Sequence, residues 1–324
     1  MALVNRRQAT GDRRQNKFGR IGVLMGGPSS EREVSLKSGR AVLESLNSLG
    51  LNAAAIDIRT DRKIDNIRLL RSRNIDCAFV ALHGKFGEDG GIQEILESMN
   101  IPYTGSGVLA SKLAMDKISS RKIFQVYGLN VPGCEVLNRF FYNKNKYKRN
   151  KSVFPLVVKP ATNGSSIGLS IVEKPALLDK AIELAFDYDD NIIIEQYIKG
   201  RELTVAILGN KALPVIEIVP KRKFFDYQAK YKYGLTEYLV PAPLPQGLKR
   251  KVQLCALKAH RILGCFGCSR VDIILDDKSR AYILEVNTIP GLTQTSLLPK
   301  AASSAGIGFA QLVLELVGLA YEKN

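Results

Sequence analysis

Long apolar runs are missing from the 324-residue sequence, and histidine and cysteine are scarce, with two and five residues respectively. No run approaches the roughly 18 apolar residues that cross a bilayer, and the first residues contain no secretory apolar segment. We therefore expect no membrane insertion. The cysteines are odd in number and scattered along a long chain, which favours reduced thiols and a cytoplasmic location.

The scarcity of cysteine and histidine also argues against a zinc or redox site. Cys265 and Cys268 form one C-x-x-C pattern, but no second such pattern and no histidine pair accompanies it. The pattern lies between an expected helix and an expected strand, so we interpret both residues as buried or turn cysteines. His260 lies inside that helix among apolar neighbours, and we expect it to be a packing residue.

The formal net charge is +16, but the position of the charge weakens a nucleic-acid interpretation. Residues 1–20 carry a net +5 and residues 138–151 a net +6, so most of the excess lies in two polar segments. We predict a disordered basic tail over 1–18 and a solvated basic insertion over 138–151, and no requirement for nucleic acid. The alternative is salt-sensitive, sequence-blind attachment to nucleic acid or anionic lipid.

The N-terminal part of the sequence alternates strands and helices. Residues 21–25 form a short apolar strand, and a glycine turn leads into a helix expected over 31–49, where Ser30 and Glu33 predict a capping box. A strand, a glycine turn and a helix N-terminus together present backbone N–H groups to a ligand. A second buried strand is expected over 77–82.

We predict an open, parallel α/β domain over residues 19–104. Ligands of such domains bind beyond the carboxyl ends of the strands. Glu31 and His83 both fall at those ends, which makes them candidate ligand-binding residues.

Two further units follow. Over residues 105–195 we expect a central domain with a helix near 110–127, the basic insertion, and a strand–loop–strand flap whose glycine loop is 163–168. This loop is suited to close over phosphates through its backbone N–H groups. Over residues 196–324 we expect a third domain with a polar, aromatic mobile loop at 221–241.

Oxygen-donor side chains gather at the ends of the last two expected strands. Asp272 lies in one strand, and Glu285 and Asn287 end the next. Hard divalent cations such as Mg²⁺ prefer these ligands, with substrate phosphates completing the shell. Arg270 lies two residues before Asp272, so both side chains point to one face of the strand. A cation beside a metal site is suited to clamp a transferring phosphoryl group.

Ten short motifs occur in order between Ile21 and about Glu322. They are Gly26–Ser35, Leu82–Gly84, Gly87–Gly90, Tyr103–Gly107, Met115–Lys117, Val158–Pro160, Gly164–Ser166, Asp226–Tyr231, Arg270–Asp272 and Glu285–Gly291. Through these motifs the chain resembles the ATP-grasp enzymes and, within them, the D-alanine:D-alanine ligases. The resemblance implies a mixed α/β (α+β) ATP-grasp fold with a Rossmann-like N-terminal domain, a central lid domain and a C-terminal catalytic domain.

The resemblance also implies a reaction. The carboxylate of one D-alanine attacks the γ-phosphate of ATP to give an acyl phosphate, and the amine of a second D-alanine then displaces phosphate. The dipeptide supplies peptidoglycan synthesis. The same resemblance implies ATP as co-substrate, two Mg²⁺ ions with Mn²⁺ as a substitute, and a homodimer.

Site residues are carried over from the family position by position. ATP contacts are expected from Lys117, Lys159, Ser165, Ser166, Glu195, Gln196, Tyr197, Ile198, Glu202 and Lys230. Metal ligands are expected to be Asp272, Glu285 and Asn287, and substrate contacts to come from Glu31, His83, Lys230, Ser296 and Leu297. Catalytic roles are expected for Glu31, Ser165, Tyr231, Arg270 and the backbone N–H of Gly291.

The second substrate is the least constrained part of this hypothesis. In the family a tyrosine at the position of Tyr231 accompanies dipeptide formation, whereas phenylalanine accompanies D-alanyl-D-lactate. Phe225 and Gln228 depart from the tyrosine and glutamate that relatives often carry in this loop. One alternative is an ATP-grasp ligase that takes D-lactate or D-serine. Another is a non-catalytic nucleic-acid-binding protein on the same scaffold, which predicts the loss of metal ligands that are all present here.

Overall fold

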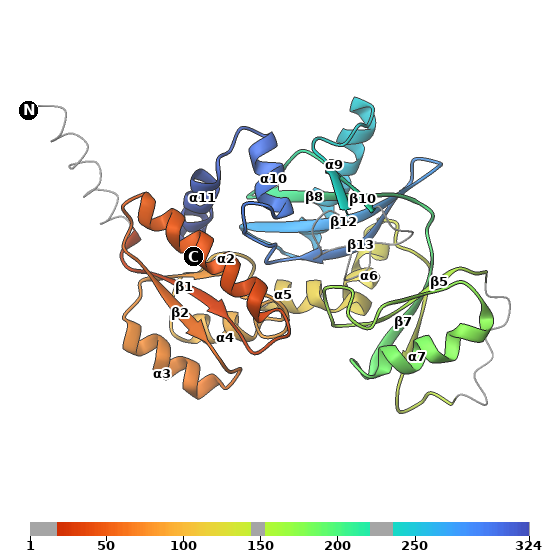
Figure 1. Ribbon diagram of the computed structural model, residues 1–324, viewed down its shortest axis with the longest axis horizontal. Helices are drawn as coiled ribbons and strands as arrows, with labels where there is room; N and C mark the ends of the chain where they lie inside the picture. Colours follow the sequence, from red (N-terminus) through yellow and green to blue (C-terminus); the bar gives the residue numbers. More distant parts are fainter. Residues whose placement is uncertain (1–17, 144–152, 221–235, 324) are drawn as a thin grey trace, which may run out of the picture.

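The computed structural model describes residues 18–143, 153–220 and 236–323. Three β-sheets organise this part of the chain, with the N-terminal sheet and the β5–β7 sheet at opposite ends and the largest sheet between them (Figure 1). Several predictions lie wholly or largely outside the described residues: the tail 1–18, much of 138–151 and 221–241, and Lys230 and Tyr231.

The N-terminal sheet contains three parallel strands in the order β2-β1-β3. Their bounds are β1 Ile21–Gly26, β2 Ala53–Ile58 and β3 Cys77–Val80. The alternation of β1 divides its side chains between two cores, because neighbouring residues of a strand point to opposite faces. Val23 packs with helix α2 (Arg32–Ser48), and Leu24 packs with α3 (Lys63–Arg73) and α4 (Gly91–Ser98). The predicted open parallel sheet is confirmed, although the sequence did not identify β2.

The sheet at the other end of the molecule is antiparallel, in the order β4-β7-β5-β6. Its elements are β4 Cys134–Asn138, β5 Leu156–Pro160, β6 Ser170–Val172, a short 3₁₀ turn η1 Pro175–Leu177, α7 Leu178–Phe186 and β7 Asn191–Gln196. Helix α7 buries Ile182 and Phe186 on one face of the sheet. Strands β5 and β6 pair as the predicted flap, with the glycine loop between them.

The largest sheet follows the order β11-β10-β8-β12-β13, with β9 beside β8. Its strands are β8 Gly200–Leu208, β9 Lys211–Ala212, β10 Ile216–Pro220, β11 Thr236–Leu239, β12 Cys268–Asp276 and β13 Ala281–Asn287. Strand β8 sits between β10 and β12, and its side chains alternate between two cores. Val205 faces helix α9 (Gln246–Ile262), whereas Ala206 faces α10 (Leu297–Ser304).

The helix expected near 110–127 is two helices. They are α5 (Val108–Met115) and α6 (Lys117–Val126), separated by Asp116 in an extended conformation. Asp116 caps α6, because its carboxylate accepts hydrogen bonds from the N–H of Ile118 and the hydroxyl of Ser119. Aspartate is a preferred N-cap residue, so this break could have been read from the sequence. It places Lys117 at the start of a helix.

The last helix of the chain packs against the first sheet. Helix α11 (Phe309–Glu322) contributes Leu312 and Leu316 to the same core as Val23 and Val42. Tyr321 Oη also donates to the backbone oxygen of Phe18 at 2.6 Å. The N-terminal and C-terminal parts therefore share one core. The domain boundaries predicted at 104/105 and 195/196 stay predictions.

No single helix among the described residues is long and apolar enough to cross a membrane. Helices α10 and α11 reach the length and apolarity of a membrane span only when they are taken together. They are bent by 105° relative to each other.

Two glycines give a matched test of how β8 and β12 pack. A Cβ on Gly200 would lie 2.3 Å from the backbone oxygen of Leu275, whereas nothing lies within 4 Å of a Cβ on Gly318. We expect Gly200→Ala to lower the free energy of unfolding by about 1–3 kcal/mol. Gly318→Ala, inside helix α11, is expected to raise it by about 0.5–1 kcal/mol. Urea unfolding measures both, and equal effects would contradict this strand register.

Candidate active site

Two carboxylates face each other across strands β12 and β13. Asp272 is paired with Glu285, and Arg270 is paired with Asn287. Residues paired in an antiparallel ladder point to the same side of the sheet, so these four side chains form one cluster. The ladder shifts register after Asp272, and such bulges are frequent beside active sites.

Two cations hold these carboxylates. Arg270 donates from Nε and Nη2 to the two oxygens of Asp272 at 2.9 and 2.8 Å, and Thr204 Oγ1 donates to Asp272 Oδ1 at 2.7 Å. Lys117 Nζ lies 3.4 Å from Glu285 Oε2. Burial alone would lower the pKa of Arg270, but the charge and hydrogen bonds of Asp272 outweigh it and raise the pKa. Arg270 is therefore a permanent cation.

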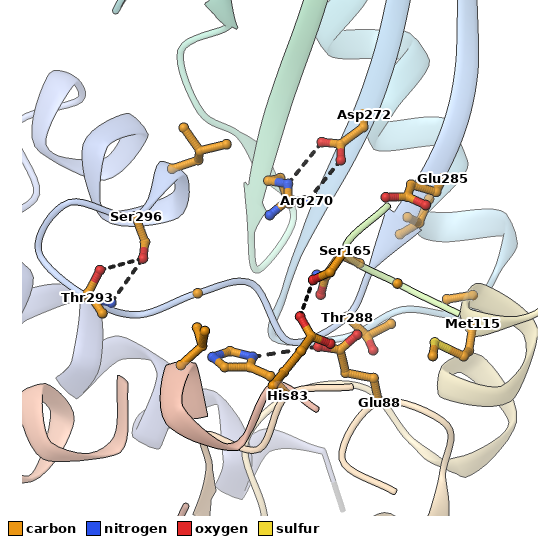
Figure 2. Close-up of a pocket in the computed structure, with 18 of the residues that line it drawn as sticks. His83, Glu88, Met115, Ser165, Arg270, Asp272, Glu285, Thr288, Thr293 and Ser296 are labelled. Atoms are coloured by element: carbon orange, nitrogen blue, oxygen red, sulfur yellow. Dashed lines mark hydrogen bonds and ion pairs between the residues drawn. The ribbon is translucent and has the colours of Figure 1, made fainter. Parts of the chain in front are cut away.

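A cavity of about 510 Å³ opens beside this cluster. The close-up shows that it lies between Arg270 and Asp272 of β12, Ser165 of the flap and His83 of the N-terminal domain (Figure 2). The predicted residues that line it are Glu31, His83, Lys117, Ser165, Arg270, Asp272, Glu285, Asn287, Gly291, Ser296 and Leu297. The structure therefore brings together the described residues predicted for substrate and metal.

A second cavity of about 380 Å³ lies between the flap and the largest sheet. The predicted ATP residues that line it are Lys117, Lys159, Ser166, Glu195, Gln196, Tyr197, Ile198 and Glu202. Ser165 lines the first cavity and Ser166 the second, so the flap loop separates the two. The cavities share Lys117, Ile218, Asp272 and Glu285. The candidate site is thus one cleft with two compartments that meet at the facing carboxylates.

The predicted capping box of Ser30 and Glu33 is wrong. Helix α2 begins after Glu31, and no side chain caps its first turn. The carboxylate of Glu31 instead accepts a short hydrogen bond from the hydroxyl of Ser165 in the flap. Ser29 Oγ accepts from the backbone N–H of Glu31 at 3.2 Å and donates to the backbone oxygen of His83 at 2.6 Å. The polar side chains at this helix end therefore shape the cavity.

The far end of the larger cavity is formed by the start of helix α10. Ser296 is the N-cap residue, and its Oγ accepts from the backbone N–H of Thr293 at 3.1 Å. A helix N-terminus favours an anionic group nearby. Gly291 approaches this residue closely, since a Cβ there would lie 2.8 Å from Ser296 Oγ.

Comparisons with known proteins agree with this geometry. The model of the D-ala D-ala ligase C-terminus matches residues 123–318, and that of the N-terminus matches 64–106. The D-alanine–D-alanine ligase of Geotalea uraniireducens strain Rf4 is 51% identical over 304 residues, which are 94% of this chain and 96% of that protein. The chain belongs to the D-alanine–D-alanine ligase family.

Solved structures support the same assignment. The D-alanine–D-alanine ligase of Bacillus anthracis complexed with ATP has a TM-score of 0.82 at 38% identity, over 94% of this chain and 97% of that one. The VanG D-Ala:D-Ser ligase of Enterococcus faecalis has a TM-score of 0.80 at 34% identity, over 94% and 100%. The predicted mixed α/β ATP-grasp fold of the D-alanine–D-alanine ligase family is confirmed.

Sequence reasoning missed a buried arginine behind the smaller cavity of this ligase-family chain. Arg121 is 2% exposed, and its Nη1 lies 2.6 Å from Glu195 Oε2, while Lys159 Nζ donates to Glu195 Oε1 at 2.7 Å. Arg121 also donates a short hydrogen bond to the backbone oxygen of Pro132. Burial lowers the pKa of Lys159, and the charge of Glu195 opposes this shift. Two buried cations therefore share one carboxylate.

A second missed residue is Glu88, which lines the larger cavity beside His83. Glu88 Oε1 lies 3.6 Å from His83 Nδ1 (Figure 2), and burial raises the pKa of Glu88. Its position in the Gly87–Gly90 motif was the available signal.

The side chains at the junction, where the two cavities meet, offer the donor atoms that a hard divalent cation prefers. Asp272 and Glu285 supply carboxylate oxygens and Asn287 an amide oxygen, which are the ligands that Mg²⁺ prefers. Asn287 Oδ1 accepts from the backbone N–H of Ile289 at 2.8 Å, which fixes the amide and leaves a second lone pair. Within 18–143, 153–220 and 236–323, no group of three or more histidine, cysteine, aspartate and glutamate side chains could hold a metal ion. The predicted metal site therefore needs the amide oxygen of Asn287 and oxygens of substrate phosphates in addition to its two carboxylates.

The remaining cysteine and histidine predictions concern packing. Cys265 and Cys268 are buried and unpaired by any disulfide, and burial raises the pKa of each thiol to about 12. Such thiols carry little thiolate and react slowly. His260 is 2% exposed and lies 2.7 Å from Ser269 Oγ, and burial lowers its pKa to about 4. The predicted packing role of His260 is confirmed.

The buried arginine gives a test of how much the ion pairs behind the smaller cavity stabilise the fold. Arg121→Met leaves Glu195 with only Lys159 as a partner, so we expect the free energy of unfolding to fall by roughly 3 kcal/mol. The matched control is Arg139→Met, because Arg139 pairs with Asp190 at 2.8 Å where both side chains are about half exposed. Its cost should be about 1 kcal/mol or less. Guanidinium unfolding compares them, and a similar small loss in both would contradict the buried role of Arg121.

Proposed function

We propose that this chain joins two D-alanine molecules at the expense of ATP, through a D-alanyl phosphate, to supply peptidoglycan synthesis. The observation that supports this most directly is the junction of the two cavities at Lys117, Asp272 and Glu285. A nucleotide in the smaller cavity and an amino acid in the larger one would meet there. Membership of the D-alanine–D-alanine ligase family supports D-alanine as the amino acid.

At the nucleotide end, the adenine would lie along Glu195, Gln196, Tyr197 and Ile198, with the ribose near Glu202. Lys159 and Lys117 would then face the phosphates. Lys117 Nζ is already directed to the junction, since it lies 3.4 Å from Glu285 Oε2, and it also donates to the backbone oxygen of Asn163 at 2.8 Å. Phosphoryl transfer is accelerated mainly by positioning and by charge neutralisation, which these fixed cations supply.

We propose that Asp272, Glu285 and Asn287 hold two Mg²⁺ ions, with Mn²⁺ as a substitute. When bound, these ions neutralise charge on the β- and γ-phosphates. Arg270 is tied to Asp272 by two hydrogen bonds, so its guanidinium stays beside the position of the transferring phosphoryl group.

At the amino-acid end, Glu31 would bind the ammonium of the first D-alanine, with His83 in the same network. Arg270 and the N–H of Gly291 would stabilise the oxyanion that forms when the second amine attacks. Ser296 and Leu297, at the N-terminus of α10, would bind the second carboxylate, together with Lys230. Lys230 and Tyr231 belong to the proposal on the family motif alone.

Closure of the flap protects the intermediate. The hydrogen bond between Ser165 and Glu31 joins the flap to the N-terminal domain. A closed flap excludes water, which would otherwise hydrolyse the acyl phosphate. We propose that Tyr231 completes this link. The homodimer and the cytoplasmic location stay predictions.

The metal assignment is tested by a change of one oxygen. Glu285→Gln removes a carboxylate charge at the junction, so we expect turnover to fall by at least about a thousandfold while the fold is retained. The control is Glu94→Gln, because Glu94 also pairs with a lysine, Lys63 at 3.0 Å, but on the exposed surface. Phosphate release and circular dichroism measure both variants. Near-normal turnover of Glu285→Gln would reject the metal site.

The substrate assignment is tested by product analysis. Mg·ATP is supplied with D-alanine, with L-alanine, and with D-alanine plus D-lactate or D-serine, and products are identified by mass. We expect D-alanyl-D-alanine from D-alanine alone and no product from L-alanine. Product only in the presence of D-lactate or D-serine would keep the mechanism and change the second substrate. A folded, ATP-binding chain that forms no product would support the non-catalytic alternative.

A further inference from the structure

Ser38 lies on helix α2, is fully buried and does not line either cavity. Its Oγ nevertheless contacts His83, which lines the larger cavity, and Leu292, which lies between the lining residues Gly291 and Thr293. His83 Nε2 lies 2.9 Å from it, and the backbone N–H of Leu292 donates to it at 3.3 Å. His83 follows strand β3, and Leu292 follows Gly291 in the segment after β13. One hydroxyl therefore joins three segments that are far apart in the sequence.

The hydrogen bonds of Ser38 have a direction. A backbone N–H only donates, so Ser38 Oγ accepts from Leu292 and its own proton is available for His83 Nε2. The other ring nitrogen of His83, Nδ1, faces Glu88 Oε1 at 3.6 Å. Both contacts are satisfied when His83 carries its proton on Nδ1 and Nε2 accepts from Ser38. The chain of contacts thus runs from the Leu292 backbone through Ser38 and His83 to Glu88.

Helix α2 carries a second buried serine that provides a comparison. Ser35 is as fully buried as Ser38 and lies one turn before it. Its Oγ accepts from the backbone N–H of Gly26 at 2.9 Å and donates to the backbone oxygen of Ala81 at 2.7 Å. Those partners belong to the ends of the N-terminal strands and do not line either cavity. The two serines therefore make equal numbers of hydrogen bonds, one with the scaffold and the other with the site.

We propose that Ser38 is a positioning residue for the ligation reaction, an inference that rests on the function proposed above. The N-terminal domain carries Glu31 and His83, which face the first D-alanine. The C-terminal domain carries the N–H of Gly291, which faces the oxyanion. Ser38 holds the backbone one residue after Gly291 against His83 and so sets the separation of these two groups. Misplacement of reacting groups by about 1 Å can lower a rate a hundredfold.

The test compares Ser38→Ala with Ser35→Ala in the full chain. Both variants lose two buried hydrogen bonds, so both should lose a similar amount of thermal stability. We expect Ser38→Ala to lower kcat/KM for D-alanine by about tenfold to a hundredfold, with the KM for ATP unchanged. Ser35→Ala should keep the kcat/KM of the wild type. Equal kinetics in the two variants, or normal kinetics in Ser38→Ala, would overturn the proposal.

A second variant covers the case in which Ser38→Ala does not fold. Ser38→Cys keeps a side chain of similar size but replaces the hydroxyl with a thiol, which is a weak donor and acceptor. We expect it to fold and to lose kcat/KM for D-alanine, and full activity would overturn the proposal. The wild type is assayed first. An inactive wild type would reject the proposed function, whereas an active wild type with unaffected Ser38 variants would reject this inference alone.

Discussion

The pairing of Asp272 with Glu285 across two antiparallel strands is the constraint on which the rest of the site depends. Like charges directly opposite each other in a sheet are unfavourable, so this pair requires nearby cations. Arg270 comes from the same strand as Asp272, and Lys117 comes from the start of helix α6. The two cavities meet here, where the cations and the flap converge on these two carboxylates.

The charge around the smaller cavity explains why a metal suits this site. Its described lining residues include five carboxylates, Glu195, Glu202, Glu217, Asp272 and Glu285, and three cations, Lys117, Lys159 and Arg201. Two further cations beside the cavity, Arg121 and Arg270, pair with Glu195 and Asp272. The protein's own cations are therefore matched by its carboxylates, and they leave little positive charge for a polyphosphate. Divalent cations bound with the polyphosphate would supply that charge at the carboxylates.

What the sequence could predict was local. Arg270 and Asp272 share a face because they are two residues apart in a strand, and Glu31 and His83 lie at predicted strand ends. The capping box failed because Glu31 and Ser29 make contacts with Ser165 and His83, which no local pattern records. Arg121 and Ser38 were missed for the same reason, since each acts through residues distant in the sequence and neither lines either of the two cavities. Glu88 lines the larger cavity, and its place in the Gly87–Gly90 motif was a local signal that was overlooked. The break at Asp116 is a second such case, because its signal was local and was overlooked.

Helices α2 and α11 share one apolar core, and this core decides what a single hydrogen bond across the site can contribute. Leu312 and Leu316 pack in the same core as Val42 of α2, so the two domains are already held together by burial of apolar surface. A single hydrogen bond adds little to such an interface. It can still select one arrangement among those that the apolar core permits, because hydrogen bonds depend on direction and hydrophobic contacts do not. Helix α2 thus contributes both kinds of interaction, with Val42 joining the domains and Ser38 setting their register at the site.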